Sequence, residues 1–199
     1  MLIEIHMLQN HAPSNLNRDD TGSPKEAVFG GFKRARISSQ CLKRSIRRSD
    51  VFRDQLSGSL GTRTRSLPTM VKAGLIAAGI DEKMATIGAQ KASGFGTEKG
   101  TEQKANEGGY YRTAQTMFLS DSDVEAVTKV ILDAARESDG NVKNFEKVTA
   151  KALQKLAEDA GGRPLSVDIA LFGRMVTSES FVNVEASSQF AHAISTHKI

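Results

Sequence analysis

The segment that decides the fold reads Ala27-Val-Phe-Gly-Gly-Phe-Lys-Arg-Ala-Arg-Ile37 and continues as Ser38-Ser-Gln-Cys-Leu-Lys-Arg-Ser-Ile-Arg-Arg48. Its two adjacent glycines, Gly30 and Gly31, are typical of a turn. The first part therefore predicts a short strand, or a hairpin broken at the glycines. Ser38 is a favoured N-cap residue, so the second part predicts a helix that begins directly after it.

The same segment carries the basic excess of the chain. The 199 residues contain 27 Lys and Arg against 23 Asp and Glu, a net charge of +4. No acid lies between Glu26 and Asp50, where seven cations fall: Lys33, Arg34, Arg36, Lys43, Arg44, Arg47 and Arg48. The remainder has 20 cations against 23 acids and is slightly acidic. Leu42 and Ile46 lie one helical turn apart and are expected to face inward, which leaves the cations on the outer face.

This charge pattern predicts a polyanionic ligand. Like charges one turn apart are mildly destabilising in a helix, and the phosphate backbone of a nucleic acid is a suitable counterion. At the helix start, Ser38, Ser39 and Gln40 could complete an anion pocket around the exposed amides. The alternative is a solvated helix face whose charges pair with distant acids, with Ser38 as a cap only.

The composition excludes several classes of protein. With 39% apolar and 25% charged residues, the chain is typical of globular proteins. No apolar run approaches the roughly 20 residues of a membrane span, and the start has no basic region followed by an apolar core. A single cysteine, Cys41, suits a reducing compartment. We therefore expect a cytoplasmic protein without membrane partners.

Strands are expected at both ends of the chain. Leu2–Leu8 is rich in β-favouring residues, Val167–Phe172 alternates and ends at Gly173, and Phe190–Ile199 is a further candidate. The turn-rich stretch Gln9–Lys25 predicts a long loop, and long ordered loops are usually functional.

Helices are expected in the middle of the chain. The first two predicted helices are Pro68–Gly79 and Asp81–Ala92, the second with Asp81 as its N-cap. The third is Ser120–Glu137, which begins with a capping box between Ser120 and Asp123. The fourth is Val142–Ala160, which is expected to end at Gly161-Gly162 and to face inward with Phe145, Val148, Ala152 and Leu156. Arg53–Arg65 and Ser93–Tyr111 predict loops, the second of them mobile. The plan is α+β: a strand-based domain in 1–60 and 165–199, with a helical insertion in 61–164.

Arg174 and Met175 form a second candidate site. They follow Gly173, at the end of the predicted strand Val167–Phe172. A glycine at this place permits close approach of another backbone or a ligand. An exposed Met175 could wedge between bases, although a methionine more commonly packs in a core.

Evidence for an enzyme is weak. None of the histidines, His6, His11, His192 and His197, lies in a metal-ligand spacing. His6 and His192, both in candidate strands, could meet as the acid and base of a ribonuclease, but structural histidines are the commoner case. No phosphate-loop motif or carboxylate cluster is present, so we expect no metal and no cofactor.

Several blocks of sequence resemble the CasC family, the repeated backbone subunit of type I-E CRISPR Cascade complexes. The matching blocks are Ile5-His6, His11–Asp20, Lys25, Phe29-Gly-Gly, Arg36–Arg47, Val167–Ser178 and Ala191–His197. They occur in the family's order and lie at both ends of the chain, whereas the helical middle contributes little.

The resemblance implies an RRM-like, ferredoxin-type palm with a helical finger insertion. It implies a non-enzymatic subunit that grips the CRISPR guide RNA backbone without reading sequence, stacks on copies of itself and other Cascade subunits, and meets target DNA through the guide. The expected RNA contacts are Arg18, Lys25, Ser38, Gln40, Lys43, Arg44 and Arg47, together with Arg34 and Arg36 of the basic segment. Met175, beside Arg174, would pack where one guide base is turned out.

Family members continue beyond the strand at Ala191–His197 into a thumb and further palm strands. We therefore expect the chain to correspond to the N-terminal part of such a subunit, with an exposed sheet edge. Two other functions stay open at this stage. One is a metal-independent CRISPR RNA endonuclease that uses His6 and His192, and the other is a DNA-binding regulator with the basic helix in the major groove.

Overall fold

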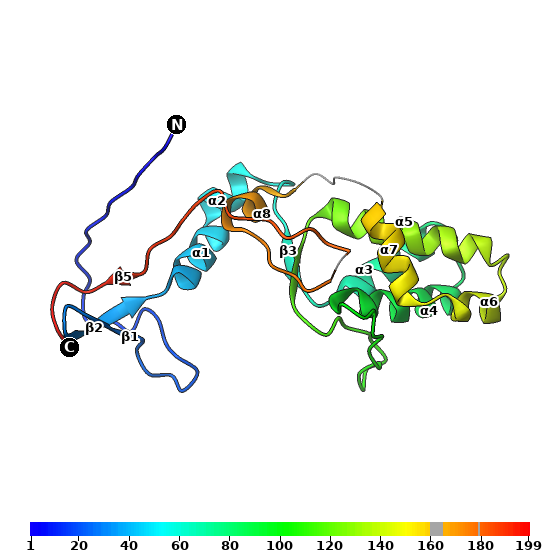
Figure 1. Ribbon diagram of the computed structural model, residues 1–199, viewed down its shortest axis with the longest axis horizontal. Helices are drawn as coiled ribbons and strands as arrows, with labels where there is room; N and C mark the ends of the chain where they lie inside the picture. Colours follow the sequence, from blue (N-terminus) through cyan, green and yellow to red (C-terminus); the bar gives the residue numbers. More distant parts are fainter. Residues whose placement is uncertain (160–164, 179) are drawn as a thin grey trace. The chain divides into compact units, whose positions relative to one another are not determined.

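The structure is a computed structural model that describes residues 1–159, 165–178 and 180–199 (Figure 1). It combines two small sheets with several helices, which confirms the predicted α+β class. The chain forms two compact units, the first comprising Met1–Phe52 with Gln189–Ile199 and the second Arg53–Ser188. The predicted boundaries after residues 60 and 164 both fall inside the second unit. No helix in the described ranges is long and apolar enough to cross a membrane.

The first unit contains the predicted hairpin. Strands β1 (Glu26–Phe29) and β2 (Phe32–Ile37) pair antiparallel, with Phe29 opposite Phe32 across the turn. Gly30 and Gly31 have φ of 64° and 79°, a conformation that glycine adopts without strain. A short third strand, β5 (Ala193–Ile194), pairs with β2, so the sheet order is β1-β2-β5.

Helix α1 (Ser39–Arg48) follows β2 directly, as predicted. The hydroxyl of Ser38 accepts a hydrogen bond from the Cys41 amide at 3.3 Å, which confirms the N-cap. Leu42 and Ile46 are half-buried rather than fully enclosed. Helix α2 (Asp50–Gln55) comes next and includes the first residues of the predicted loop Arg53–Arg65.

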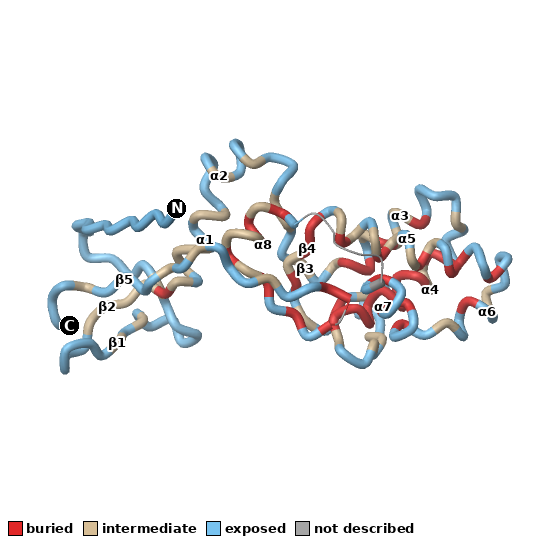
Figure 2. Tube along the Cα trace, turned by 45° about the horizontal axis from the view of Figure 1, so that its top comes forward, coloured by how far each residue is buried: buried red, intermediate tan, exposed pale blue. Residues whose placement is uncertain are grey.

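The prediction of a strand at Leu2–Leu8 is wrong for this structure. These residues have no regular secondary structure, and their large apolar side chains are exposed. The whole N-terminal segment is coloured as exposed in Figure 2. A β-favouring run becomes a strand only when a sheet edge pairs with it, and the described strands of this unit pair only with one another. For the same reason only Ala193–Ile194 of the predicted strand Phe190–Ile199 is a strand.

The second unit is mainly helical. Its helices are α3 (Leu67–Ala77), α4 (Glu82–Ser93) with the short η1 (Gly94–Gly96), α5 (Asp121–Glu137), α6 (Val142–Lys147), α7 (Ala150–Asp159) and α8 (Val167–Phe172). Strands β3 (Thr62–Thr64) and β4 (Met117–Leu119) pair antiparallel. Strand β4 directly precedes α5 in the chain. Asp81 accepts bonds from the amides of Lys83 and Met84, so the predicted N-cap of α4 is confirmed.

The hydrophobic core lies within this unit, where α3 packs on α4 and α5, and α5 on α7. Leu75, Ile131, Phe95 and Leu153 are fully enclosed, and Figure 2 shows buried segments in α3, α4, α5 and α7. The buried hydrophobic residues among the described ones all belong to the second unit. The predicted loop at Ser93–Tyr111 therefore begins only after η1, because η1 is packed in the core.

The predicted helix Val142–Ala160 is two helices, α6 and α7, separated at Val148 and Thr149. The buried ammonium of Lys91 donates to the carbonyls of Glu146 and Val148. It thus satisfies backbone groups that the end of a helix leaves without partners. Burial lowers the pKa of Lys91, against an opposing effect of Glu102.

This break changes which residues of the last helix face the core. Leu153 and Ala157 are fully buried, whereas the predicted inward residues Ala152 and Leu156 are exposed. When a helix restarts after a break, the set of positions that face the core shifts along the sequence. A helical pattern continued from Phe145 therefore predicts the wrong inward residues. The predicted stop at Gly161-Gly162 lies outside the described residues.

The predicted strand Val167–Phe172 is helix α8. A run of six residues is too short for its periodicity to separate a strand from a helix. Long-range polar contacts favour the helix, since the Asp168 carboxylate accepts hydrogen bonds from the Gly61 amide and the Ser166 hydroxyl, each at 2.8 Å. Gly173, with φ of 78°, ends it.

The phase of α7 can be tested with two leucines of the same helix. Leu153→Ala should lower the free energy of unfolding by about 2–5 kcal/mol, because it opens a cavity in the core. Leu156→Ala, on the exposed face, should change it by no more than about 0.5 kcal/mol. Thermal or denaturant unfolding of the two variants measures the difference, and a larger loss at Leu156 would refute this packing.

Candidate nucleic-acid interface

Asn17 organises the surroundings of the helix start in the first unit. Its side-chain oxygen accepts the amide hydrogen of Ser38 at 2.9 Å, and its carbonyl accepts the amide of Lys25 at 2.8 Å. The amide of Arg36 in turn donates to the carbonyl of Lys25 at 2.9 Å. The loop that carries Arg18 and Lys25 is therefore held against the end of β2 and the start of α1. We had not predicted Asn17 as a site residue, because an asparagine in a turn-rich loop carries no distinguishing signal.

The loop itself is closed around Asp19. Its carboxylate accepts the amides of Thr21 and Ser23, each at 2.9 Å, and the hydroxyl of Thr21 at 2.8 Å. These bonds, the Thr21 hydroxyl first, lower the pKa of Asp19. Arg18, next to this acid, is exposed and forms a backbone bridge with Pro24. The turn thus fixes the backbone beside Arg18 without engaging its side chain.

Arg36 lies at the end of β2 and is half-buried. Its Nε atom is buried and has no hydrogen-bond acceptor among the described residues. A buried donor without an acceptor costs about 1–3 kcal/mol. Ser38, two residues later, is also buried and carries the N-cap. Arg36 at the end of β2 and the N-cap of α1 are thus two residues apart in the chain.

The cations of α1 differ in their surroundings. Lys43 has its ammonium 5.8 Å from the centre of the Phe190 ring, a cation–π arrangement within the first unit. Arg44 and Arg48 are exposed, Arg47 is half-buried, and Gln40 is exposed at the first turn. The predicted contacts Lys43, Arg44 and Arg47 thus lie on one helix directly after the Asn17 loop.

Two cations of the basic segment are engaged inside the sheet. Lys33 forms an ion pair with Glu26 at 3.0 Å. Arg34 donates to the carbonyls of Phe29, Ser195 and Thr196 at 3.1, 3.0 and 2.5 Å. Its guanidinium ties β2 to the C-terminal segment, so the structure does not support the predicted RNA contact of Arg34. The partners Ser195 and Thr196 lie about 160 residues away, where no local pattern can reveal them.

Arg174 is buried rather than presented to a ligand. Its guanidinium forms an ion pair with Asp123 at 2.5 Å and donates to the carbonyls of Phe118 and Val182 at 3.1–3.2 Å. Both charged side chains are nearly inaccessible, 2% and 3% exposed. The predicted RNA contact of Arg174 is therefore corrected to a structural role in the second unit.

Met175 has the opposite placement. It is 92% exposed, although its neighbours Arg174 and Val176 are buried. Arg174 forms a two-way backbone bridge with Val184, and the Val176 amide donates to the Asn183 side chain at 2.7 Å. The flanking residues are thus anchored, which holds an apolar side chain in solvent and excludes the core-packing interpretation of Met175.

The candidate catalytic histidines, His6 and His192, both lie on the surface. The His6 side chain is 89% exposed on the unpaired N-terminal segment, with Glu4 3.7 Å away. His192 is exposed as well. The described part of the chain contains no group of three His, Cys, Asp or Glu side chains that could hold a metal ion.

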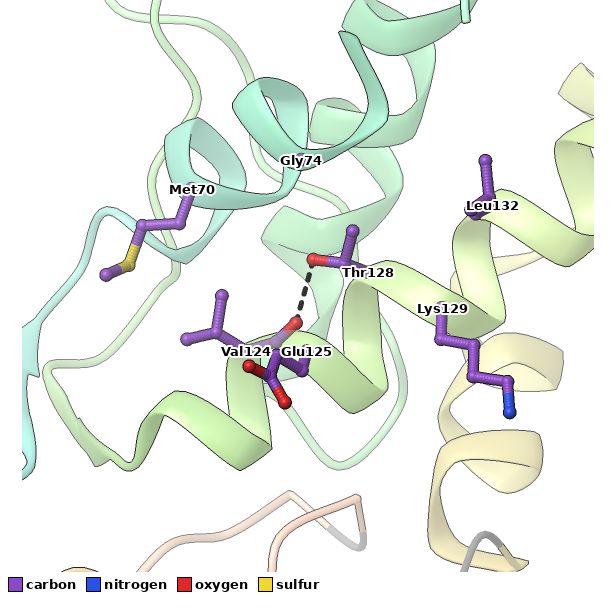
Figure 3. A pocket seen from close by; sticks show the side chains of 7 residues that line it. All are labelled: Met70, Gly74, Val124, Glu125, Thr128, Lys129 and Leu132. Carbon is purple, nitrogen blue, oxygen red and sulfur yellow. Dashed lines mark hydrogen bonds between the residues drawn. The ribbon is translucent and has the colours of Figure 1, made fainter. Parts of the chain in front are cut away.

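The described residues of the second unit line an apolar groove and a more polar one. One, of about 330 Å³, is apolar and lies between α3 and α5 (Figure 3). Here the helices approach closely, since a Cβ atom at Gly74 would lie 2.7 Å from the Thr128 methyl group. The other, of about 450 Å³, is more polar and is lined by residues 96–101, 114, 115 and 177.

Comparisons with known proteins agree with one another. The sequence model of the CT1975-like protein family, a family of Cas proteins, matches residues 3–199. A chain of a solved CRISPR RNA-guided surveillance complex is similar, with a TM-score of 0.68, 28% identity, and coverage of 93% of this chain and 55% of that one. A chain of such a complex in a pre-nicking state is also similar, with a TM-score of 0.68 and 28% identity. That match covers 93% of this chain and 50% of the other. This chain thus spans about half the length of these structural relatives. No curated protein sequence matches it.

Breaking the buried ion pair should destabilise the second unit. Arg174→Met leaves the Asp123 carboxylate buried without its cation, and such a change typically costs about 3–5 kcal/mol. The same substitution at the exposed Arg112 is the matched control and should cost no more than about 0.5 kcal/mol. Denaturant unfolding compares the two variants. Equal stabilities would show that Arg174 does not hold this segment.

Proposed function

The chain belongs to the CT1975-like family of Cas proteins, and from that premise we propose that it is a non-enzymatic guide-RNA-binding subunit of a Cascade-type CRISPR surveillance complex. In this proposal it corresponds to the CasC backbone subunit of type I-E systems. It binds the guide RNA backbone irrespective of sequence and stacks beside further copies of itself and other subunits. Target DNA is reached only through the guide.

The observation that carries this proposal is the grouping of donors at the start of α1. Asn17 fixes the backbone of Arg18 and Lys25 beside the N-terminal end of the helix. Arg36, at the end of β2, precedes Ser38 by two residues and places a further cation in the chain next to the helix start. Cations, hydroxyls and helix amides are the groups that bind phosphate oxygens.

The character of these groups favours backbone binding over base reading. Phosphate contacts position a nucleic acid, whereas bidentate contacts to base edges specify sequence. The cations Lys43, Arg44 and Arg47 follow the anion-binding helix start along one helix. A row of positive charges beside an anion pocket suits a sugar–phosphate chain of any sequence, with sequence left to base pairing.

Met175 supplies a second element of the proposal. An exposed apolar side chain on an anchored backbone can insert at an unstacked base step. In the CasC family the methionine at this position of the Gly-Arg-Met block packs where a guide base is turned out. We assign the same role to Met175, in the second unit, with Arg174 as its support rather than as a further contact.

We further interpret the first unit as part of an RRM-like palm and the second as the fingers. The sheet β1-β2-β5 and α1 supply a strand–helix arrangement of the palm type. The helices of the second unit form a separate core. Both assignments follow from the CasC resemblance, since three short strands alone are compatible with several α+β folds.

Removal of single helix cations should weaken RNA binding without changing its sequence preference. Lys43→Ala and Arg47→Ala should each reduce affinity for unrelated single-stranded RNAs about equally and lower the salt slope by about 0.7. Fluorescence anisotropy at several salt concentrations measures both quantities. Lys83→Ala, an exposed lysine of the second unit, is the control and should leave both nearly unchanged.

Two outcomes would contradict backbone gripping. One is a loss confined to a single RNA sequence, which indicates base reading. The other is tighter, sequence-dependent binding of duplex DNA, which favours a regulator with α1 in the major groove.

Incubation with labelled guide precursor should give no metal-independent cleavage. His6 and His192 are exposed, and neither is held in position by a described side chain other than Glu4 beside His6. A catalytic acid and base need fixed hydrogen-bond geometry. Gel analysis in the presence of EDTA is the measurement, with His6→Ala as the matched variant. Cleavage that His6→Ala abolishes would establish the endonuclease instead.

A further inference from the structure

Strands β3 and β4 form a two-stranded ribbon in the second unit (Figure 2). Arg63 of β3 lies directly opposite Phe118 of β4, and its guanidinium is 6.0 Å from the centre of the ring. Met117 and Leu119, on either side of Phe118, are buried. Phe118 itself is half-buried, and Arg63 is exposed. Because side chains alternate between the two faces of a strand, the pair of Arg63 and Phe118 lies on the outer face of the ribbon.

A second arginine is held directly after β3. The Nε atom of Arg65 donates to the carbonyl of Thr113 at 2.8 Å, and the Thr113 amide donates to the Arg65 carbonyl at 3.0 Å. Thr113 is fully buried, so it is a fixed support for Arg65. Arg65 is exposed, and within the described part of the chain no acceptor binds its two Nη groups. Arg112, next to Thr113 in the chain, is a third exposed arginine.

The charge of these arginines is not neutralised by their sequence neighbours. Residues 55–80 and 108–120, which contain the two strands, include no Asp or Glu. The acids that contact the ends of the ribbon are Asp168 and Asp123, and each is only 2% exposed. Both carboxylates accept hydrogen bonds from protein groups, and Asp123 is paired with a buried arginine. The ribbon therefore has positive charge on its surface that an external anion can neutralise.

Arginines beside an aromatic ring suit a nucleic acid better than an acidic protein. Bases of a single strand stack on aromatic rings and on guanidinium planes, while cations bind the phosphates. A carboxylate of an acidic protein gains nothing from the ring, because the face of an aromatic ring is itself electronegative. The half-buried ring of Phe118 next to Arg63 thus favours a ligand that has bases as well as negative charge.

We propose that the outer face of this ribbon is a second binding surface for single-stranded nucleic acid. This ribbon surface consists of Arg63, Arg65, Arg112 and Phe118. A base stacks on the pair of Arg63 and Phe118, and Arg65 and Arg112 bind the neighbouring phosphates. The ligand chemistry is a phosphate chain with unpaired bases, which an RNA or a DNA strand can supply. The inference goes beyond the proposed function, since it assigns strand binding to the second unit as well.

A fluorescent reporter tests the stacking. The chain contains no tryptophan, so Phe118→Trp in the full chain introduces a single one. We expect oligouridine and oligothymidine, titrated separately, to show which strand quenches its emission, because a stacked base contacts the indole. The matched control is Leu156→Trp at an exposed position of α7, whose emission should stay unchanged. Quenching by either strand supports the inference, whereas binding of both strands without quenching would overturn it.

Two substitutions test the arginines in the protein that retains Phe118. Arg112→Gln should weaken binding about threefold and lower the salt slope by about 0.7, because one phosphate contact is lost. Arg63→Lys keeps the charge and removes the guanidinium plane, so it should weaken binding about fivefold with an unchanged slope. The control is Arg136→Gln at an exposed position of α5, which should bind like the unmodified protein. Fluorescence anisotropy with both oligonucleotides measures these effects.

The outcomes separate this inference from the proposed function. If Lys43→Ala weakens binding and the variants of Arg63 and Arg112 do not, the ribbon surface is no binding site while the proposed function stands. If only the variants of Arg63 and Arg112 weaken binding, the proposed site at the start of α1 fails and the inference stands. Polyglutamate that quenches Phe118→Trp as strongly as either strand would assign the surface to an acidic protein and overturn the inference. If the unmodified protein binds neither strand, both proposals fail.

Discussion

The buried ion pair between Asp123 and Arg174 is the contact on which the architecture of the second unit depends. The same carboxylate oxygen accepts the amide and the hydroxyl of Ser120, each at 2.9 Å, and so completes the capping box of α5. The guanidinium meanwhile binds carbonyls of Phe118 in β4 and of Val182. One pair thus joins the helix start, the short sheet and the segment that presents Met175. These additional hydrogen bonds offset part of the cost of removing the two charges from water.

The two units are stabilised in different ways. The second has a continuous hydrophobic core, so its polar side chains can be held rigidly at the edges of that core. The first unit, among its described residues, is ordered by backbone pairing and by side chains such as Asn17 and Arg34 that bind distant carbonyls. Hydrogen bonds exchanged with water contribute only about 0.5–1.5 kcal/mol each. A charged ligand at the start of α1 would therefore also stabilise the first unit itself.

Local sequence predicted those elements whose ends are encoded locally. Ser38, Asp81 and Ser120 cap helices whose starts agree with expectation, and Gly30-Gly31 gave the hairpin. The failures at Leu2–Leu8, Val148 and Val167–Phe172 depend on partners that are distant in sequence. A strand needs a sheet edge, the carbonyls after α6 are bound by Lys91, and Asp168 of α8 accepts a hydrogen bond from Gly61. Periodicity carries no information about such partners.

The site shows the same limit for arginine. The sequence alone does not separate an arginine that binds a ligand from one that binds the protein itself. It predicts RNA contacts for Arg34, Arg36 and Arg174 alike. Arg34 and Arg174 use their guanidinium groups on carbonyls and a carboxylate of the protein, whereas the buried Nε of Arg36 has no such acceptor in the described residues. A guanidinium has five donors in a fixed plane, so those already committed cannot serve a phosphate. Phosphate binding is therefore to be sought at the start of α1, while Arg174 contributes by anchoring the backbone that holds Met175 in solvent.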